Sequence, residues 1–115
     1  MAVQKFEELQ VWRKSQDFCV AIYNNFLGLK DYVFKDQITR ASISVSNNIA
    51  EGFDRNSNAE FIRFLYFATG SSSEVRSMLY LASRLGFLSE DISNKLIEDS
   101  NEISRMLYGL IKSLK

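Results

Sequence analysis

Apolar residues recur along most of the chain at alternating steps of three and four, which is the period of an amphipathic helix. Gly28, Gly52 and Gly86 fall where this periodicity stops, and a glycine after the last periodic residue commonly ends a helix. The chain therefore divides into four segments of helical length. The pattern predicts helices over residues 7–27, 35–52, 58–85 and 90–114.

Capping residues support the starts of the last two helices. The third segment opens on Ser57-Asn58-Ala59-Glu60, a capping box in which the Ser57 and Glu60 side chains each satisfy an orphan backbone N–H. The fourth segment follows Ser89, and serine is a favoured N-cap residue. We therefore expect well-defined N-termini for both helices.

The second segment is the hardest to assign. Its residues Ile43, Val45 and Ile49 are β-branched and would also suit a strand. Strict alternation of apolar and polar residues fails at Asn47–Asn48, whereas the helical period continues, so we predict a helix. Residues 28–34, which precede it, are predicted to form a connection.

Three short connections between four amphipathic helices favour antiparallel neighbours. We predict an all-α fold, an antiparallel up-down-up-down four-helix bundle, with residues 1–115 forming a single domain. Six residues on the apolar faces are expected to be buried: Trp12, Ile49, Leu65, Leu79, Ile103 and Leu107.

Composition narrows the classes of function. The 14 Lys and Arg balance the 14 Asp and Glu, so the total charge shows no sign of a dedicated nucleic-acid or membrane-surface binder. The chain has no His, the commonest general base and metal ligand, and its single Cys excludes an internal disulfide. No leader or membrane-spanning run is recognisable. We expect a cytoplasmic protein without catalytic, cofactor-binding or metal-binding residues and without a membrane partner.

The alternative function is a small metal protein or enzyme built on a helical bundle. Paired carboxylates at Glu98 and Glu102, and at Glu51 and Glu60, would suit a di-metal bundle site only with Glu-x-x-His motifs, which the chain lacks. The run Ser71-Ser72-Ser73 has no nucleophile elbow around it and no His to act as its base. Surface charge and close helix packing are the favoured interpretations of these residues.

The helix predicted over 35–52 carries a regular polar stripe opposite its Ile38–Val45–Ile49 row. Such a stripe is often only a solvated face, but amides and Arg side chains also make directional contacts with another chain. Its charges cancel, so we predict that Arg40, Asn48, Glu51 and Arg55 hold this helix to neighbouring backbone or to another subunit. The candidate interface or RNA-contact residues are Gln37, Arg40, Ser44, Asn48, Glu51, Arg55 and Arg63.

The aromatic content is high, with nine Phe, five Tyr and one Trp. Phe61, Phe64, Tyr66 and Phe67 crowd one helix, and Tyr66 points away from the face shared by Phe61 and Phe64. One bundle core does not bury every direction, so some aromatic side chains are expected at an interface. With only Arg63 interleaved, a subunit interface is favoured over a stacking surface for single-stranded nucleic acid.

Several stretches match motifs of one known family. Phe6–Trp12 has the form Phe-x-x-Leu-x-Val-Trp, and Gln37–Gly52 contains Gln-x-x-Arg-Ala and Asn-Ile-Ala-Glu-Gly. Glu60–Glu74 and Met106–Ile111 continue the match. The sequence thereby resembles the bacterial four-helix-bundle family of 23S rRNA intervening-sequence proteins, also called S23 ribosomal proteins. It departs at Thr39, where the family commonly has a second Arg, and it lacks the family's usual Pro before the Ser-Asn-Ile run.

The resemblance implies an up-down bundle and a ring-like homo-oligomer, commonly a pentamer. The founding members are encoded within insertions in large-subunit ribosomal RNA genes. A similar bundle is the accessory protein of diversity-generating retroelements, where it partners a reverse transcriptase and nucleic acid. The implied partners are therefore further copies of the chain and RNA, an RNA-processing protein or a reverse transcriptase. The expected function is that of a non-catalytic assembly or RNA-associated accessory protein.

Overall fold

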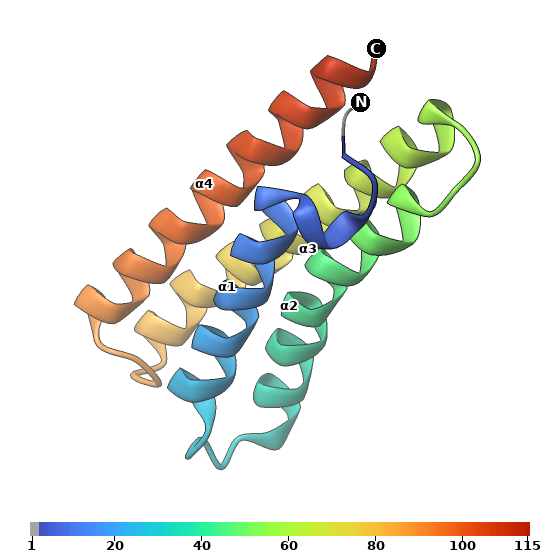
Figure 1. Ribbon diagram of the computed structural model, residues 1–115. Coiled ribbons are helices and arrows are strands. Elements are labelled where there is room, and N and C mark those ends of the chain that lie inside the picture. Colours follow the sequence, from blue (N-terminus) through green and yellow to red (C-terminus); the bar gives the residue numbers. More distant parts are fainter. Residues whose placement is uncertain (1–2) are drawn as a thin grey trace.

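Four long helices, preceded by a short 3₁₀-helix, make up most of the computed structural model, which describes residues 3–115. Successive helices run in opposite directions, so the start of the described chain, the end of α4 and the α2–α3 turn lie at one end of the bundle (Figure 1). The predicted antiparallel all-α bundle is confirmed, and none of the described residues forms a strand. The elements are η1 (Phe6–Glu8), α1 (Gln10–Phe26), α2 (Tyr32–Phe53), α3 (Asn58–Arg84) and α4 (Glu90–Leu114).

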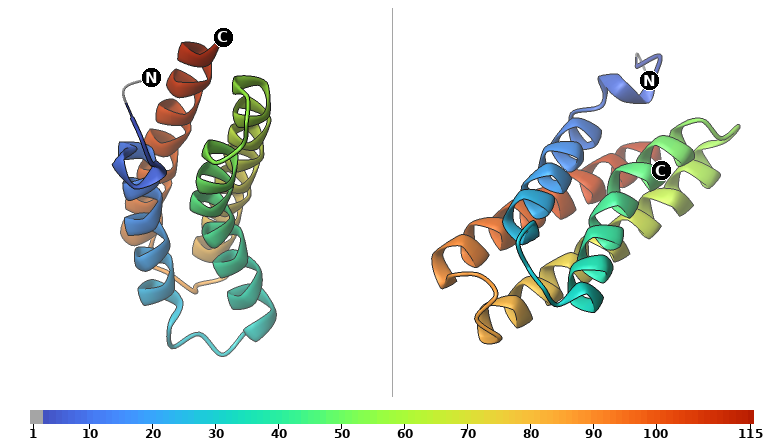
Figure 2. Two further views of the ribbon diagram at one scale, coloured as in Figure 1. Left: turned by 45° about the vertical axis from the view of Figure 1, so that its right-hand side comes forward. Right: turned by 90° about the horizontal axis from the view of Figure 1, so that it is seen from below.

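The four helices share one long axis, and the bundle measures 43 × 21 × 20 Å (Figure 2). Each helix contacts the helices before and after it in sequence, and α1 also contacts α4. The diagonal pairs, α1 with α3 and α2 with α4, make no such contact within the described chain. Surfaces on α1 and α3 therefore face opposite sides of the molecule.

The predicted serine caps of α3 and α4 are confirmed, whereas the Glu60 carboxylate, expected to complete the capping box, lies 3.5 Å from Arg63 Nη1. Ser57 Oγ accepts a hydrogen bond from the Glu60 N–H at 3.2 Å, and Ser89 Oγ accepts one from the Ile92 N–H at 3.2 Å. At the other end of α3, Gly86 has φ 75°, the left-handed conformation that glycine adopts without steric cost. The two serine caps and the Gly86 helix end each involve residues that are close in sequence, so the sequence alone predicts them.

Two helix starts differ from the prediction. The helix α2 begins at Tyr32 and not at residue 35, because the Asp31 carboxylate accepts a hydrogen bond from the Phe34 N–H at 3.1 Å. The helix predicted from residue 7 is interrupted at Leu9, whose backbone is extended (φ −75°, ψ 123°). The extended Leu9 is buried, and the preceding turn is the separate helix η1.

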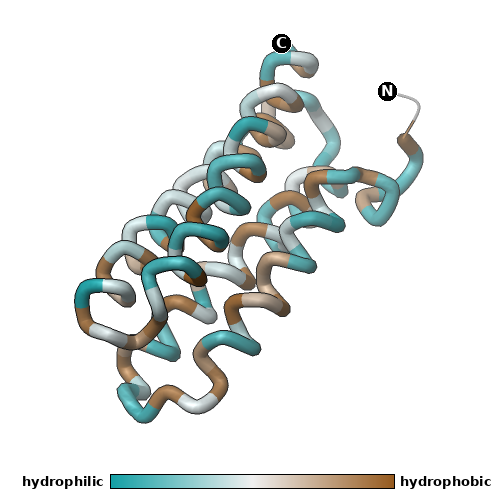
Figure 3. The backbone as a smooth tube through the Cα atoms, turned by 90° about the vertical axis from the view of Figure 1, so that its left-hand side faces the viewer, coloured by the Kyte–Doolittle hydropathy of each residue, from teal (hydrophilic) through white to brown (hydrophobic). Residues whose placement is uncertain are grey.

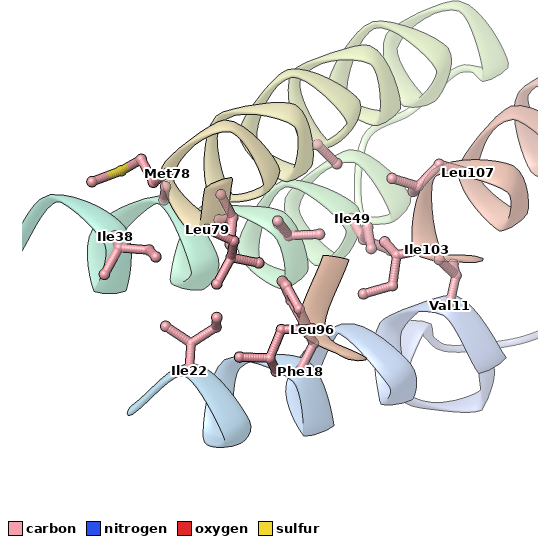
Figure 4. Packing of buried hydrophobic residues seen from close by; sticks show 14 of the residues in the cluster. Val11, Phe18, Ile22, Ile38, Ile49, Met78, Leu79, Leu96, Ile103 and Leu107 are labelled. Carbon is pink, nitrogen blue, oxygen red and sulfur yellow. The ribbon is translucent and has the colours of Figure 1, made fainter. Parts of the chain in front are cut away.

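All four helices contribute to one hydrophobic core (Figure 4). Five of the six residues predicted to be buried are fully enclosed, with no exposed surface: Ile49, Leu65, Leu79, Ile103 and Leu107. The prediction for Trp12 is wrong, because its ring is only partly buried and packs edge-on against Phe6, with centroids 5.2 Å apart. Along each helix, hydrophobic and hydrophilic residues alternate within each turn, as an amphipathic helix requires (Figure 3).

Candidate functional site

Part of the polar stripe on α2 faces α3. Gln37 Nε2 donates to Glu74 Oε2 at 3.4 Å, and the hydroxyls of Ser44 and Ser71 are 3.0 Å apart. Asn48 Nδ2 donates to the Ser44 carbonyl at 2.8 Å and to Ser44 Oγ at 2.9 Å. These polar groups join α2 to α3 at the rim of their packed interface.

The charged members of the stripe pair with residues four positions away in the chain. Arg40 Nε lies 3.0 Å from Asp36 Oδ2, and Arg55 Nη2 lies 3.5 Å from Glu51 Oε1. Only Arg55 reaches another helix, because its guanidinium lies 4.7 Å from the ring centroid of Phe64 on α3. The stripe is therefore two sets of residues, one at the α2–α3 rim and one pointing to solvent.

Arg63 lies on α3, apart from that stripe. Its Nη1 is 3.5 Å from Glu60 Oε1, and its guanidinium lies 5.2 Å from the ring centroid of Phe67. Both Arg63 and Phe67 are exposed, with 45% of Phe67 accessible to solvent. Of the four crowded aromatic residues on α3, Phe61 and Phe64 are buried, whereas Tyr66 and Phe67 face solvent.

A surface hollow of about 670 Å³ lies where α1 ends and α2 begins. Its apolar wall is formed by Tyr23, Tyr32 and Val33, and two candidate residues, Gln37 and Arg40, lie at its edge. Tyr32 and Val33 are 71% and 79% exposed, which leaves large apolar side chains in water. We call this region the α1–α2 corner; its apolar members are Val20, Tyr23, Leu27, Tyr32 and Val33.

A second exposed apolar surface lies on α3. Leu81 and Leu85 are 44% and 52% exposed, and their spacing of four residues places them on one helix face. Because α1 and α3 are diagonal in the bundle, this α3 surface and the α1 part of the corner face different sides of the molecule. We call Leu81 and Leu85 the α3 leucine pair.

The α1–α2 corner was missed in the sequence. Tyr32 and Val33 belong to the stretch predicted as a connection, and Tyr23, within the helix predicted over residues 7–27, is 45% exposed. The sequence does carry one sign of the corner, the apolar residues on both sides of Gly28. Whether these apolar side chains are exposed depends on how α1 packs against α2, which the hydropathy pattern does not specify.

The polar side chains inside the bundle hold helices together. Ser72 Oγ lies 3.4 Å from both the Ser100 carbonyl and Ser104 Oγ on α4, and Cys19 Sγ lies 3.4 Å from Ser42 Oγ. Within residues 3–115, no three Cys, Asp or Glu side chains gather as metal ligands. On the surface of α4, the Asp99 carboxylate accepts a hydrogen bond from Lys95 and raises the pKa of that lysine.

Comparison with known families gives one match, to the model of the 23S rRNA-intervening sequence protein family, over residues 7–109. The chain belongs to this family. Among solved structures, six chains match. One is a protein of unknown function from the S23 ribosomal protein family of Bacteroides thetaiotaomicron VPI-5482, which is 31% identical, with a TM-score of 0.83. The match covers 89% of the present chain and 98% of the Bacteroides chain. No curated protein matches.

The match to the 23S rRNA-intervening sequence protein family runs from η1 through most of α4, so it includes residues of all four helices. It includes all seven candidate residues from Gln37 to Arg63, as well as the α1–α2 corner and the α3 leucine pair. Among the described residues, no helix is both long enough and apolar enough to cross a membrane.

Proposed function

We propose that this 23S rRNA-intervening sequence protein is a non-catalytic subunit of a closed homo-oligomeric ring, a pentamer by resemblance to its family. The observation that carries the proposal is the α1–α2 corner, where Tyr32 and Val33 are 71% and 79% exposed beside a hollow of about 670 Å³. Contiguous exposed apolar side chains are characteristic of protein interfaces.

The proposed contact joins the α1–α2 corner of one subunit to the α3 leucine pair of the next. Leu81 and Leu85 protrude from α3 at the spacing of one helical turn, which suits insertion into the apolar hollow at the corner. A contact between two different surfaces is heterologous, and heterologous contacts close into rings when the rotation between subunits permits. Such a ring could hold RNA or an RNA-processing partner, which the family resemblance suggests.

Light scattering on the purified protein tests the assembly. We expect a mass several times the 13.2 kDa of one chain at micromolar concentration. The variant Val33→Asp should reduce the mass to that of a monomer, because it places a carboxylate in the apolar contact. It should not unfold α2, because an acidic residue in the first helical turn is favoured by the helix dipole. A 13.2 kDa wild-type particle would contradict the proposal.

Asn94→Asp is the matched control, since it adds the same charge to an exposed position near the start of α4 and should leave the mass unchanged. A mixing experiment tests the heterologous geometry. Val33→Asp and Leu81→Asp should each be monomeric alone, and together they should form a heterodimer through the one interface that both leave intact. A symmetric interface would give no such rescue.

A further inference from the structure

The total charge of the chain is zero, but three of its 14 Lys and Arg residues, Arg105, Lys112 and Lys115, lie exposed on one face of the bundle. On α4, Arg105, Tyr108, Lys112 and Lys115 follow one another at steps of three, four and three, so all four lie on one side of the helix. All four are exposed. Tyr108 faces α3, because its ring centroid lies 6.5 Å from that of Tyr66. The cationic side of α4 is therefore the side next to α3.

Tyr66 of α3 completes this face. Lys115 Nζ lies 5.9 Å from the Tyr66 ring centroid and 3.4 Å from Tyr66 Oη, so the end of α4 covers the middle of α3's first half. Arg63 is three residues before Tyr66, but its guanidinium lies over Phe64 and Phe67, 5.8 and 5.2 Å from their ring centroids, so it is not part of this face. We call the following five residues the basic tyrosine face: Tyr66, Arg105, Tyr108, Lys112 and Lys115.

Carboxylates leave most of this positive charge uncompensated. From residue 101 to the end of α4 the only acidic residue is Glu102, and its Oε2 lies 3.3 Å from Lys14 Nζ on α1, away from α3. The five ion pairs formed within residues 3–115 include Lys95 of α4, which pairs with Asp99, but not Arg105, Lys112 or Lys115.

The two tyrosines give the face a second property. Tyr66 and Tyr108 are 43% and 54% exposed, and their rings meet at 68° in an edge-to-face contact. Lys115 Nζ lies over the ring of Tyr66, and the ring of Tyr108 is the more exposed of the two. Exposed aromatic rings among cations bind unpaired bases by stacking, while the cations neutralise phosphates.

We propose that the basic tyrosine face binds single-stranded RNA, with a base stacked on Tyr108 and phosphates bound chiefly by Arg105 and Lys112. The phenol hydroxyls of Tyr66 and Tyr108, at the edges of their rings, supply hydrogen-bonding partners for a ribose 2′-hydroxyl. The face is separate from the α1–α2 corner and from the α3 leucine pair. The proposal therefore adds an activity to the assembly and holds for one subunit by itself.

Fluorescence anisotropy with a labelled 12-nucleotide oligouridylate tests this face. We expect the wild type to bind it more tightly than an RNA duplex or an oligothymidylate of equal length. The double variant Arg105→Gln/Lys112→Gln should weaken binding and flatten the slope of log K against log salt by about 1.4, since each phosphate contact to a single strand contributes about 0.7. The matched double variant Lys5→Gln/Lys30→Gln removes two exposed cations elsewhere and should bind as the wild type does.

Stacking is tested separately from charge. Tyr108→Ala should lower affinity about 5- to 150-fold, the range for one base stacked on an aromatic ring, and should leave the salt slope unchanged. Tyr108→Phe keeps the ring and should retain most of the affinity.

Three results would overturn the proposal: no binding by the wild type, equal losses in the two double variants, or equal binding of RNA and DNA. Light scattering on the same variants separates this proposal from the ring. Variants that lose RNA but keep the wild-type mass support it. If Tyr108→Ala dissociates the particle, the face is a subunit contact; the RNA proposal then fails while the assembly stands.

Discussion

Gly52 sits where the backbone of α2 leaves no room for a side chain. A Cβ at this position would lie 2.5 Å from Phe64 Cβ and 3.2 Å from Phe61 Cδ1. The Phe64 Cβ is fixed to the backbone of α3, so Gly52→Ala must push the two helices apart. We expect the free energy of unfolding to fall by about 1–3 kcal/mol, the usual cost of overpacking, in urea denaturation followed by circular dichroism.

Gly70 and Gly109 provide the matched controls for Gly52. Both lie inside helices, and an added Cβ would meet no atom within 4 Å at either position. Replacing each by Ala should therefore raise the free energy of unfolding by about 0.5–1 kcal/mol, because Ala loses less backbone entropy than Gly in a helix. A loss of stability in Gly70→Ala would contradict this and would mean that another chain packs closely there.

The contrast among these glycines shows what the sequence could not predict at the residue scale. Gly52 was interpreted as a helix end because the apolar period stops near it, whereas α2 continues through it to Phe53. A glycine is required at position 52 because of Phe64, which is twelve residues away on another helix. Gly86, by contrast, was assigned correctly because its left-handed φ ends α3 through purely local bonds.

The helix α2 carries both partly buried and exposed polar residues. Substitutions at the two kinds of position should change the free energy of unfolding by different amounts. Asn48 is partly buried and donates two hydrogen bonds to Ser44, so Asn48→Ala should lower the free energy of unfolding by about 1 kcal/mol. Arg40 pairs with Asp36 on the surface, with 78% of its side chain exposed, so Arg40→Ala should cost no more than about 0.5 kcal/mol. Thermal and urea denaturation of both variants check this; equal losses would contradict it.

Helices were predictable as elements because each carries an amphipathic period, and α2, α3 and α4 also have a side-chain cap at their start. The two errors have different causes. The earlier start of α2 has a local signal in the Asp31 cap, and Phe34 in its first turn is also buried against Phe26 and Phe87, with centroids 5.8 and 5.1 Å apart. Leu9, by contrast, leaves the helical conformation where its side chain enters the core, and that contact has no signature in the neighbouring sequence.

Over the whole molecule, stability should be unevenly distributed. The helix α1 is the shortest of the four, with 17 residues, and packs less extensively against its neighbours than α3 does against α2 and α4. We expect amide hydrogens of α1 to exchange faster than those of α3, because regions with fewer buried contacts open at lower free energy. Mass-spectrometric exchange on the Val33→Asp variant measures this without subunit contacts; equal protection of all helices would contradict it.

The candidate surfaces can be identified only from the packing of the whole molecule. The sequence identified Arg63 and the exposed aromatic residues of α3, but it placed no other cation near them. Three cations of α4 lie on the same face as Tyr66 because the antiparallel packing brings the end of α4 beside the start of α3 (Figure 1). The balanced total charge gives no sign of this segregation, because the acidic residues of α4 lie mostly in its first half and its last turns carry only cations.

The contact between Trp12 and Phe6 makes the chain's one tryptophan a local probe. The indole lies against η1 at the edge of the bundle, with ring centroids 5.2 Å apart, and is not in the fully buried core. Its emission spectrum therefore reports chiefly whether η1 is docked on α1. On heating, intrinsic fluorescence should change before the far-ultraviolet circular dichroism if the N-terminal turn detaches first, so the two signals together would reveal a step that either alone would hide.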